Sequence, residues 1–395
     1  MLQKFILKPA RAVMARLRSI AKNMLPRAVP MVVTAEKAET SSLKRMITFQ
    51  PLQISDIKEN MQPPPVNGVA ELREAIARHL YGFRGLSVSP DCIVVGAGTE
   101  YLYTLIIQLL GFQNTFAVED PGYSKIARVY QACAVRCVPV PLDAQGINLT
   151  QLAESGANVA HISPSHHFPT GRTTTIGRRY ELLRWAAAAS DRYIIEDDCD
   201  AEFRLNGRTI PTLRSIDTTA RVLYLNTFTK TLSPTIRISY LVLPAPLMAQ
   251  FRQKLGFYAS TVATMHQLTL ALFMREGHFE SHINRQRRRY RELKDHAVAA
   301  VRRQRALHDA AVLEADAGVY FLLRLPTTKS DAQLRNAARR YGLEIAFLSD
   351  YSALPADVSA TATRELAHTV IVQYASLTPA ALEEALHRLA LAVAE

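Results

Sequence analysis

Short apolar runs alternate with helical segments between residues 71 and 243, and this alternation constrains the fold more than any other feature of the sequence. The runs are apolar on both faces, as expected for strands that helices cover on both sides. Helical periodicity occurs between them, as in Leu72, Ile76 and Leu80 at four-residue spacing. The pattern predicts an α/β domain with a mostly parallel sheet. The seven predicted strands are residues 92–96, 116–120, 135–140, 158–163, 193–198, 221–226 and 238–243.

The pattern changes after residue 244, where three helical segments precede two strand-like runs and a final helix. The runs cover residues 318–325 and 369–377, and the final helix begins at Pro379. We predict three parts: a basic N-terminal segment over residues 1–60, a large domain over 61–284, and a smaller α+β domain over 285–395. The arginine-rich run at 285–291 is interpreted most simply as the solvated face of a helix, with a nucleic-acid surface as the minority alternative.

Charge and cysteine content limit the class of protein. The net charge is +12, and residues 1–45 hold ten lysines and arginines against Glu36 and Glu39. This basic amphipathic stretch leaves three interpretations: a loosely ordered tail, a mimic of an organelle presequence, or a nucleic-acid contact. No apolar run approaches the ~20 residues that span a bilayer. The four cysteines show no metal-type spacing, so we expect a reduced cytoplasmic protein without structural disulfides or a metal site.

Polar motifs follow several of the predicted strands, where an open α/β sheet binds its ligands. They are "GAGTE" (96–100), "EDPGY" (119–123), "SPSHHFPTG" (163–171), "EDDCD" (196–200) and "NTFTK" (226–230). A glycine turn at a helix start favours an anion, and a lysine forms an imine with an aldehyde. A buried carboxylate holds a pyridinium nitrogen protonated. Each motif alone has an ordinary structural explanation, but together they suit pyridoxal phosphate.

The ordered set of motifs resembles the fold type I pyridoxal-phosphate enzymes of the class I/II aminotransferase family. Within them it is most similar to the aminotransferase-like domain of MocR-type (GntR-superfamily) transcriptional regulators. The resemblance covers roughly residues 60–395 and includes "NTFTKTLSPTIRISYLVLP" and "GHFESHINRQRRRY". It implies a fold type I transferase-like fold: a large domain with a mostly parallel seven-stranded sheet, and a smaller α+β C-terminal domain.

The resemblance also implies a role for each candidate residue. Lys230 is then the Schiff-base lysine, Asp197 the carboxylate facing the pyridine nitrogen, and Tyr123 the aromatic stacked on the ring. The phosphate is expected to bind four residues: Gly98, Thr99, Thr227 and Arg237.

The sequence departs from the family pattern at several positions. Cys199 stands where most relatives have a tyrosine that bonds the ring's phenolic oxygen, and Glu100 where they often have glutamine. Phe168 replaces the asparagine of catalytic aminotransferases, a feature shared with the regulator branch. The last predicted strand has no arginine for a substrate carboxylate: Arg364 lies before it, and His368 is a poorer substitute. The regulators' winged helix-turn-helix domain has no counterpart in residues 1–60.

Three functions remain open. The first is an aminotransferase that moves an amino group between an amino acid and a 2-oxo acid. The second is a non-catalytic effector domain of a truncated MocR-type regulator that senses pyridoxal phosphate or an amine. The third is a degenerate fold without cofactor. By resemblance we expect a homodimer. DNA binding would need the basic N-terminus or a missing domain, and no membrane partner is expected.

Overall fold

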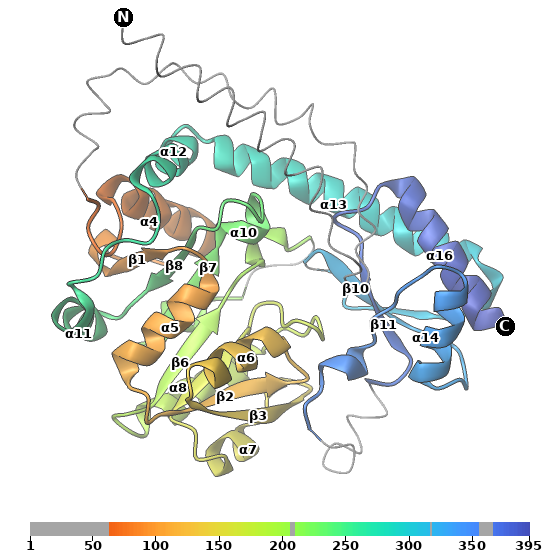
Figure 1. Ribbon diagram of the computed structural model, residues 1–395, viewed down its shortest axis with the longest axis horizontal. Helices are drawn as coiled ribbons and strands as arrows, with labels where there is room; N and C mark the ends of the chain where they lie inside the picture. The colour runs from red at the N-terminus through yellow and green to blue at the C-terminus, as the bar shows by residue number, and fades with distance from the viewer. Residues whose placement is uncertain (1–62, 206–209, 317, 355–365) are drawn as a thin grey trace, which may run out of the picture.

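The structure is a computed structural model, and it describes residues 63–205, 210–316, 318–354 and 366–395. The described chain forms a large sheet layered between helices and a small sheet beside it (Figure 1). The large sheet has the strand order β1-β8-β7-β6-β5-β2-β3-β4, and the small antiparallel sheet has the order β11-β10-β9. The predicted N-terminal segment, residues 1–60, lies outside the described residues.

The strands of the large sheet are parallel in its centre and antiparallel towards its edges. β2 pairs in parallel with β3 and β5, and β6 pairs in parallel with β5 and β7. β8 is antiparallel to β1 and β7, and β4 to β3. The strands are β1 (Ile93–Gly96), β2 (Thr115–Asp120), β3 (Arg136–Asp143), β4 (Gly146–Ile147), β5 (Val159–Ile162), β6 (Tyr193–Asp197), β7 (Val222–Thr227), β8 (Ser239–Val242), β9 (Ala311–Leu313), β10 (Tyr320–Arg324) and β11 (Thr369–Gln373).

The helices connect successive strands and cover both faces of the large sheet. They are α4 (Ala70–Arg84), α5 (Thr99–Leu110), α6 (Ser124–Ala132), α7 (Leu149–Glu154), α8 (Ile176–Ala187), α9 (Leu213–Ile216), α10 (Phe228–Thr231), α11 (Ala245–Leu255), α12 (Thr264–Arg275), α13 (His278–Arg303), α14 (Asp331–Arg340) and α16 (Pro379–Ala394). Short 3₁₀ turns lie at η1 (Pro90–Cys92), η2 (Ala201–Phe203), η3 (Arg305–Leu307) and η4 (Leu348–Tyr351). Within the described residues, no helix has the length and apolar character needed to cross a bilayer.

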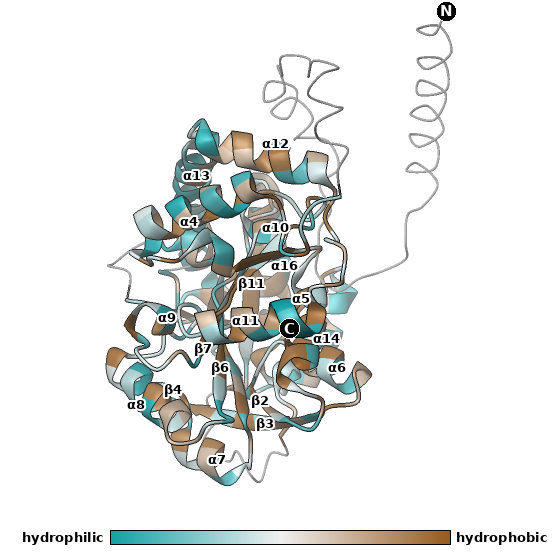
Figure 2. Cartoon of the chain, turned by 90° about the vertical axis from the view of Figure 1, so that its left-hand side faces the viewer, coloured by the Kyte–Doolittle hydropathy of each residue, from teal (hydrophilic) through white to brown (hydrophobic). Residues whose placement is uncertain are grey.

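Apolar burial on both faces explains why the sheet sits in the middle of the large domain. Every residue of β2, β5, β7 and β8 is buried. One face packs on α5, α6 and α11, and the other on α4, α12 and α8. Figure 2 shows the resulting layers, with hydrophobic strands between helices on either side. The helical stripe Leu72, Ile76 and Leu80 of α4 is fully buried, as its spacing predicted.

The predicted fold class is confirmed, with one addition to the sheet. All seven predicted strands are present as β1, β2, β3, β5, β6, β7 and β8. The eighth, β4, is a two-residue strand that pairs with the end of β3. The sequence did not predict it, because two residues show no periodicity.

The long helix α13 joins the two halves of the described chain (Figure 1). Its first turns pack on α12, and its later turns pack on α16. Residue 285, where the sequence predicts the second domain to begin, lies within this helix. The arginine run on α13 is not simply solvated. Arg287 and Arg291 donate hydrogen bonds to the carbonyls of Glu202 and Leu205, in the segment that follows β6.

Candidate functional site

A cavity of about 660 Å³ opens at the carboxyl ends of β2, β5, β6 and β7. The small half of the chain contributes Tyr320, Tyr351 and Gln373 to its wall, so the cavity lies between the two halves. Its position agrees with the rule for open α/β sheets. Six of the seven residues that the sequence selects line it: Thr99, Tyr123, Asp197, Thr227, Lys230 and Arg237.

Asp197 ends β6 as a buried carboxylate that hydrogen bonds hold in place. Oδ2 accepts from the Tyr103 hydroxyl at 2.8 Å and lies 3.3 Å from His161 Nε2. Burial alone would raise the pKa of Asp197, but the hydrogen bonds and the charge of these neighbours lower it below its usual value. A carboxylate that is ionised inside a cavity can stabilise a positive group brought next to it.

Lys230 lies in the single turn α10, directly after β7. Its side chain lines the cavity, and no hydrogen bond or ion pair to another described residue engages its amine. The turn itself is held by Thr227, whose hydroxyl accepts a hydrogen bond from the Thr229 backbone N–H at 3.1 Å. Lys230 is therefore an amine placed by the backbone and free to react.

The start of α5 and Arg237 form a cradle for an anion. Gly98 caps α5 with φ +97°, and a Cβ at this position would lie 2.4 Å from Arg237 Nη2. The φ of +97° favours glycine here, and a Cβ would also push the Arg237 guanidinium away from the helix start. The first N–H groups of a helix have no partner within it and attract anions. In the structure, Arg237 Nη2 lies 2.7 Å from Glu100 Oε2, and Lys125 contacts the other oxygen of Glu100.

The threonines around Lys230 do not have equivalent positions. Thr227, selected from the sequence, is buried, and its hydroxyl accepts from Ser239 Oγ at 2.7 Å in addition to Thr229. Thr229 also lines the cavity, and its buried hydroxyl has no partner among the described residues. A buried hydroxyl without a partner is costly, so Thr229 is the better candidate to bind a ligand.

The sequence pattern of the family described as "Aminotransferase class I and II" matches residues 26–389. The chain belongs to this family. The membership supports the expectation that pyridoxal phosphate is the cofactor.

The curated relatives include transcriptional regulators. The uncharacterized HTH-type transcriptional regulator YdeL of Bacillus subtilis is 36% identical over 287 residues, which cover 73% of this chain and 62% of that protein. The probable rhizopine catabolism regulatory protein MocR of Rhizobium meliloti is 30% identical over 285 residues, covering 72% and 57%. The chain thus spans about three fifths of the length of these relatives.

Solved structures of aminotransferases share the fold. An archaeal alanine:glyoxylate aminotransferase superposes with a TM-score of 0.73 at 20% identity, covering 99% of this chain and 98% of that one. LysN, an α-aminoadipate aminotransferase of Thermus thermophilus, gives a TM-score of 0.69 at 23% identity, covering 85% and 84%. At these identities the likeness shows the fold alone.

Cys199 and His368, two of the departures from the family pattern, lie in different surroundings. Cys199 donates to Asp197 Oδ1 at 2.5 Å, so its thiol adds to the carboxylate's hydrogen bonds. Burial raises the pKa of this thiol well above its usual value. His368 lies just before β11 and does not line the cavity, whereas Gln373 at the other end of that strand does. Arg364 lies outside the described residues.

Aromatic side chains from both halves of the chain form one wall of the cavity. Phe168 packs edge-on against Tyr123, Tyr320 and Tyr351, with ring centroids 5.8, 5.3 and 5.2 Å away. Tyr123 caps α6 and is 48% exposed, so one of its faces is free to cover a ligand. Phe168, at the position where the family pattern leads one to expect asparagine, thus contacts aromatic rings of both the large and the small half.

Sequence reasoning missed the residues that support the site. Tyr103 and His161 hold Asp197, and the Tyr130 hydroxyl holds His161 Nδ1 at 2.6 Å. Glu119 lies at the cavity wall, accepts from the Ser163 N–H at 2.7 Å, and has its pKa raised to about 8 by burial. His161 stands alone among apolar residues in the run 158–163. A buried imidazole needs hydrogen-bond partners, so this histidine was the one sequence signal for the supporting residues.

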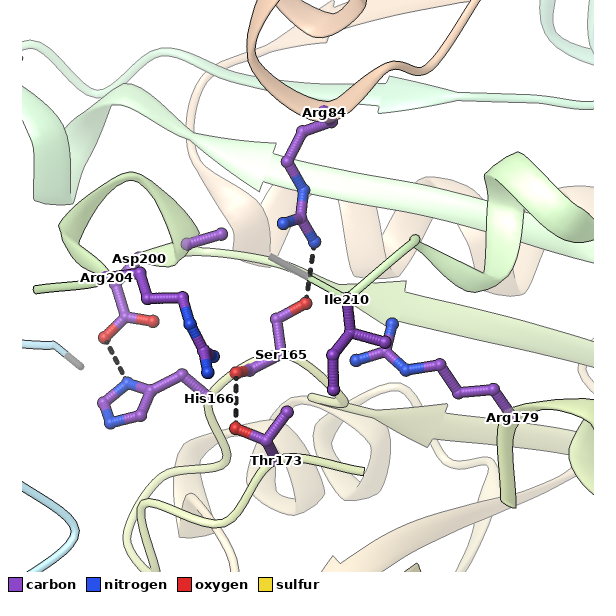
Figure 3. A pocket seen from close by; sticks show the side chains of 9 residues that line it. Arg84, Ser165, His166, Thr173, Arg179, Asp200, Arg204 and Ile210 are labelled. Atoms are coloured by element: carbon purple, nitrogen blue, oxygen red, sulfur yellow. Dashed lines mark hydrogen bonds and ion pairs between the residues drawn. The ribbon is translucent and has the colours of Figure 1, made fainter. Parts of the chain in front are cut away.

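A second, much smaller cavity of about 10 Å³ lies behind the loop at 163–173 (Figure 3). Arg84 reaches into it and donates to Ser165 Oγ at 2.8 Å. His166 Nδ1 lies 2.9 Å from Asp200 Oδ2, and both residues line this cavity and the large one. The His166–Asp200 pair therefore separates the large cavity from the arginines that line the small one. The small cavity has room for about one water molecule.

Proposed function

We propose that this protein binds pyridoxal phosphate through Lys230 and transfers an amino group between an amino acid and a 2-oxo acid. The observation that carries the proposal is the pairing of an unengaged amine, Lys230, with an ionised buried carboxylate, Asp197, in one cavity. When bound, the cofactor supplies an electron sink for bonds at the carbon that bears the amine.

The residues present fit the cofactor's parts. Lys230 would condense with the aldehyde and release water. Asp197 would keep the ring nitrogen protonated, and Tyr123 would cover one face of the ring. The phosphate would bind Gly98, Thr99 and Arg237 at the start of α5. The unpartnered hydroxyl of Thr229 offers one more donor, whereas Thr227 supports the turn that carries Lys230.

Lys230 is also the residue that we assign to proton movement. Its amine lies in the cavity without another partner among the described residues, so it can act as acid or base towards a substrate carbon. Asp197 is already held by three donors, and its role is electrostatic rather than proton transfer.

The test is the absorption spectrum of the purified protein with added pyridoxal phosphate. We expect an imine band at about 420 nm in the wild type and none in Lys230→Ala. Lys254→Ala, which removes an amine outside the cavity, serves as the control and should retain the band. Loss of the band in both variants, or its presence in Lys230→Ala, would contradict the assignment.

A second candidate function is that of an effector domain that binds the cofactor and an amine without turnover. The replacement at Phe168 and the similarity to transcriptional regulators favour it. Adding a panel of amino acids to the same protein separates the two functions. Formation of a 2-oxo acid product supports transfer, whereas a changed spectrum without product supports the effector.

The expected assembly and location belong to this proposal. We propose a homodimer, because fold type I proteins build each site from two subunits, and a cytoplasmic location. Sizing chromatography combined with light scattering tests the first: a mass near 88 kDa, twice the chain mass of 44.0 kDa, is expected. A monomer that binds the cofactor at full strength would contradict it.

A further inference from the structure

Glu100 fills the anion cradle at the start of α5. Its Oε2 lies 2.7 Å from Arg237 Nη2, and its Oε1 contacts Lys125 Nζ. Burial alone would raise the pKa of Glu100, but the Lys125 contact, its own backbone N–H and Arg237 lower it to about 2. The carboxylate is therefore charged at neutral pH, and two cations and a helix terminus hold it.

The same groups are those that the proposed function assigns to the phosphate. Arg237 faces Gly98, where a Cβ would be only 2.4 Å from the guanidinium. Arg237 itself has φ +52°, a conformation that non-glycine residues adopt rarely. The backbone and the missing side chain at Gly98 thus place one guanidinium at the helix terminus. Among the described residues, its only ion-pair partner is Glu100.

Two anions cannot share this position without repulsion, because like charges a few ångströms apart raise each other's energy. Lys125 offers Glu100 an alternative partner. It extends from α6, is about half exposed, and already contacts the carboxylate. A small rotation of Glu100 away from Arg237 would keep that contact.

We propose that Glu100 competes with the cofactor's phosphate for Arg237 and thereby sets the affinity of the cavity for phosphorylated cofactor. The inference rests on the proposed function, since it takes the ligand of the cradle to be a phosphate. Binding exchanges the carboxylate for the phosphate at Arg237, while Lys125 retains the carboxylate. A cofactor ring without a phosphate does not displace Glu100 from Arg237, so its affinity is unaffected. Glu100 therefore reduces the difference in affinity between phosphorylated and unphosphorylated cofactor.

The test compares wild type, Glu100→Gln and Glu154→Gln by equilibrium titration with pyridoxal phosphate and with pyridoxal, which lacks the phosphate. Glu154 is an exposed residue of α7 outside the cavity, so its variant makes the same change in net charge. We expect Glu100→Gln to bind pyridoxal phosphate about tenfold more tightly, the order for removing one partly screened like charge. Its affinity for pyridoxal, and both affinities of Glu154→Gln, should stay within about twofold of wild type.

Unchanged or weaker binding of pyridoxal phosphate by Glu100→Gln would overturn the inference, because Glu100 would then be positioning Arg237 rather than competing for it. Glu100→Ala is a second variant in case Gln disturbs the fold, and it must show the same gain. A melting curve of each protein identifies a folding defect.

Inorganic phosphate separates this inference from the proposed function. Its binding to the cradle, measured as a shift in melting temperature, requires no imine. Suppose that neither wild type nor Glu100→Gln forms the imine band, but that Glu100→Gln needs less phosphate than wild type for the same rise in melting temperature. The inference then holds and the proposed function fails. If the band forms but neither ligand binds more tightly to Glu100→Gln, the function holds and the inference fails.

Discussion

The most exacting prediction concerns His79, a residue of α4 that lies between a carboxylate of η2 and a carboxylate of α13. The side chain is 7% exposed in α4, with Nε2 3.5 Å from Glu202 Oε1 in η2 and Nδ1 3.8 Å from Glu280 Oε1 in α13. Burial alone would lower the pKa of His79, but the two carboxylates raise it to about 9 from 6.5. The imidazolium therefore stabilises the folded state.

The direction of the pH effect follows from linkage. The folded pKa lies above the unfolded one, so the stabilisation is complete below about pH 6.5 and is lost as the pH rises through 9. The difference between a pKa of about 9 in the folded protein and the usual 6.5 corresponds to at most about 3.5 kcal/mol, at about 1.4 kcal/mol for each pKa unit. Glu280 is half exposed and its pairing is screened by water, which places the expected loss nearer 2 kcal/mol.

Denaturant unfolding at pH 6 and pH 9.5 measures this loss. Trp185 is the only tryptophan in the chain and is buried in α8, so its fluorescence reports unfolding. We expect wild type to lose about 2 kcal/mol between the two pH values through His79, and His79→Gln to lack that part of the loss. His278→Gln, at an exposed histidine paired with Glu276, is the control and should behave as wild type. If wild type and His79→Gln lose equal stability, the coupling to the carboxylates is refuted.

Two further predictions concern the cavity. Asp197→Asn should still form the imine band but slow any amino-group transfer by about 100-fold or more, since the ring nitrogen would lose its anionic partner; unchanged turnover would contradict that role. Gly98→Ala should cost about 1–3 kcal/mol of stability, because φ +97° strains a residue with a Cβ. It should also weaken binding of pyridoxal phosphate, because the added methyl group would displace the Arg237 guanidinium. Titration and unfolding curves measure the two effects, and Gly177→Ala, where a Cβ meets no atom within 4 Å, is the control.

The sequence predicted the large sheet well, because its strands are apolar on both faces and helices of clear periodicity separate them. The two-residue strand β4 was missed, since Gly146 and Ile147 carry no periodic signal. The position of α13 across both halves was also missed, because the sequence of a continuous helix does not show where its contacts change from α12 to α16.

The cavity was predicted in its main members because each follows a strand at the same edge of the sheet. Its finer structure depends on which side chains from separate elements meet. Tyr103 comes from α5 and His161 from β5, and only the fold brings both to Asp197. Thr227 and Thr229 look equivalent in the sequence, but the turn of α10 uses one hydroxyl internally and leaves the other without a partner.

The length of α13 has a consequence for motion. Its 26 residues form an uninterrupted rod of about 39 Å, at 1.5 Å per residue. Because α13 packs on α12 at one end and on α16 at the other, any movement of the small half relative to the large sheet would also displace the C-terminal end of α13. Arg287 and Arg291 of α13 donate hydrogen bonds to backbone carbonyls in the segment that follows Cys199 and Asp200. We expect a ligand-induced movement of the small half to appear as a displacement at Arg303, which a pair of fluorescent labels could follow.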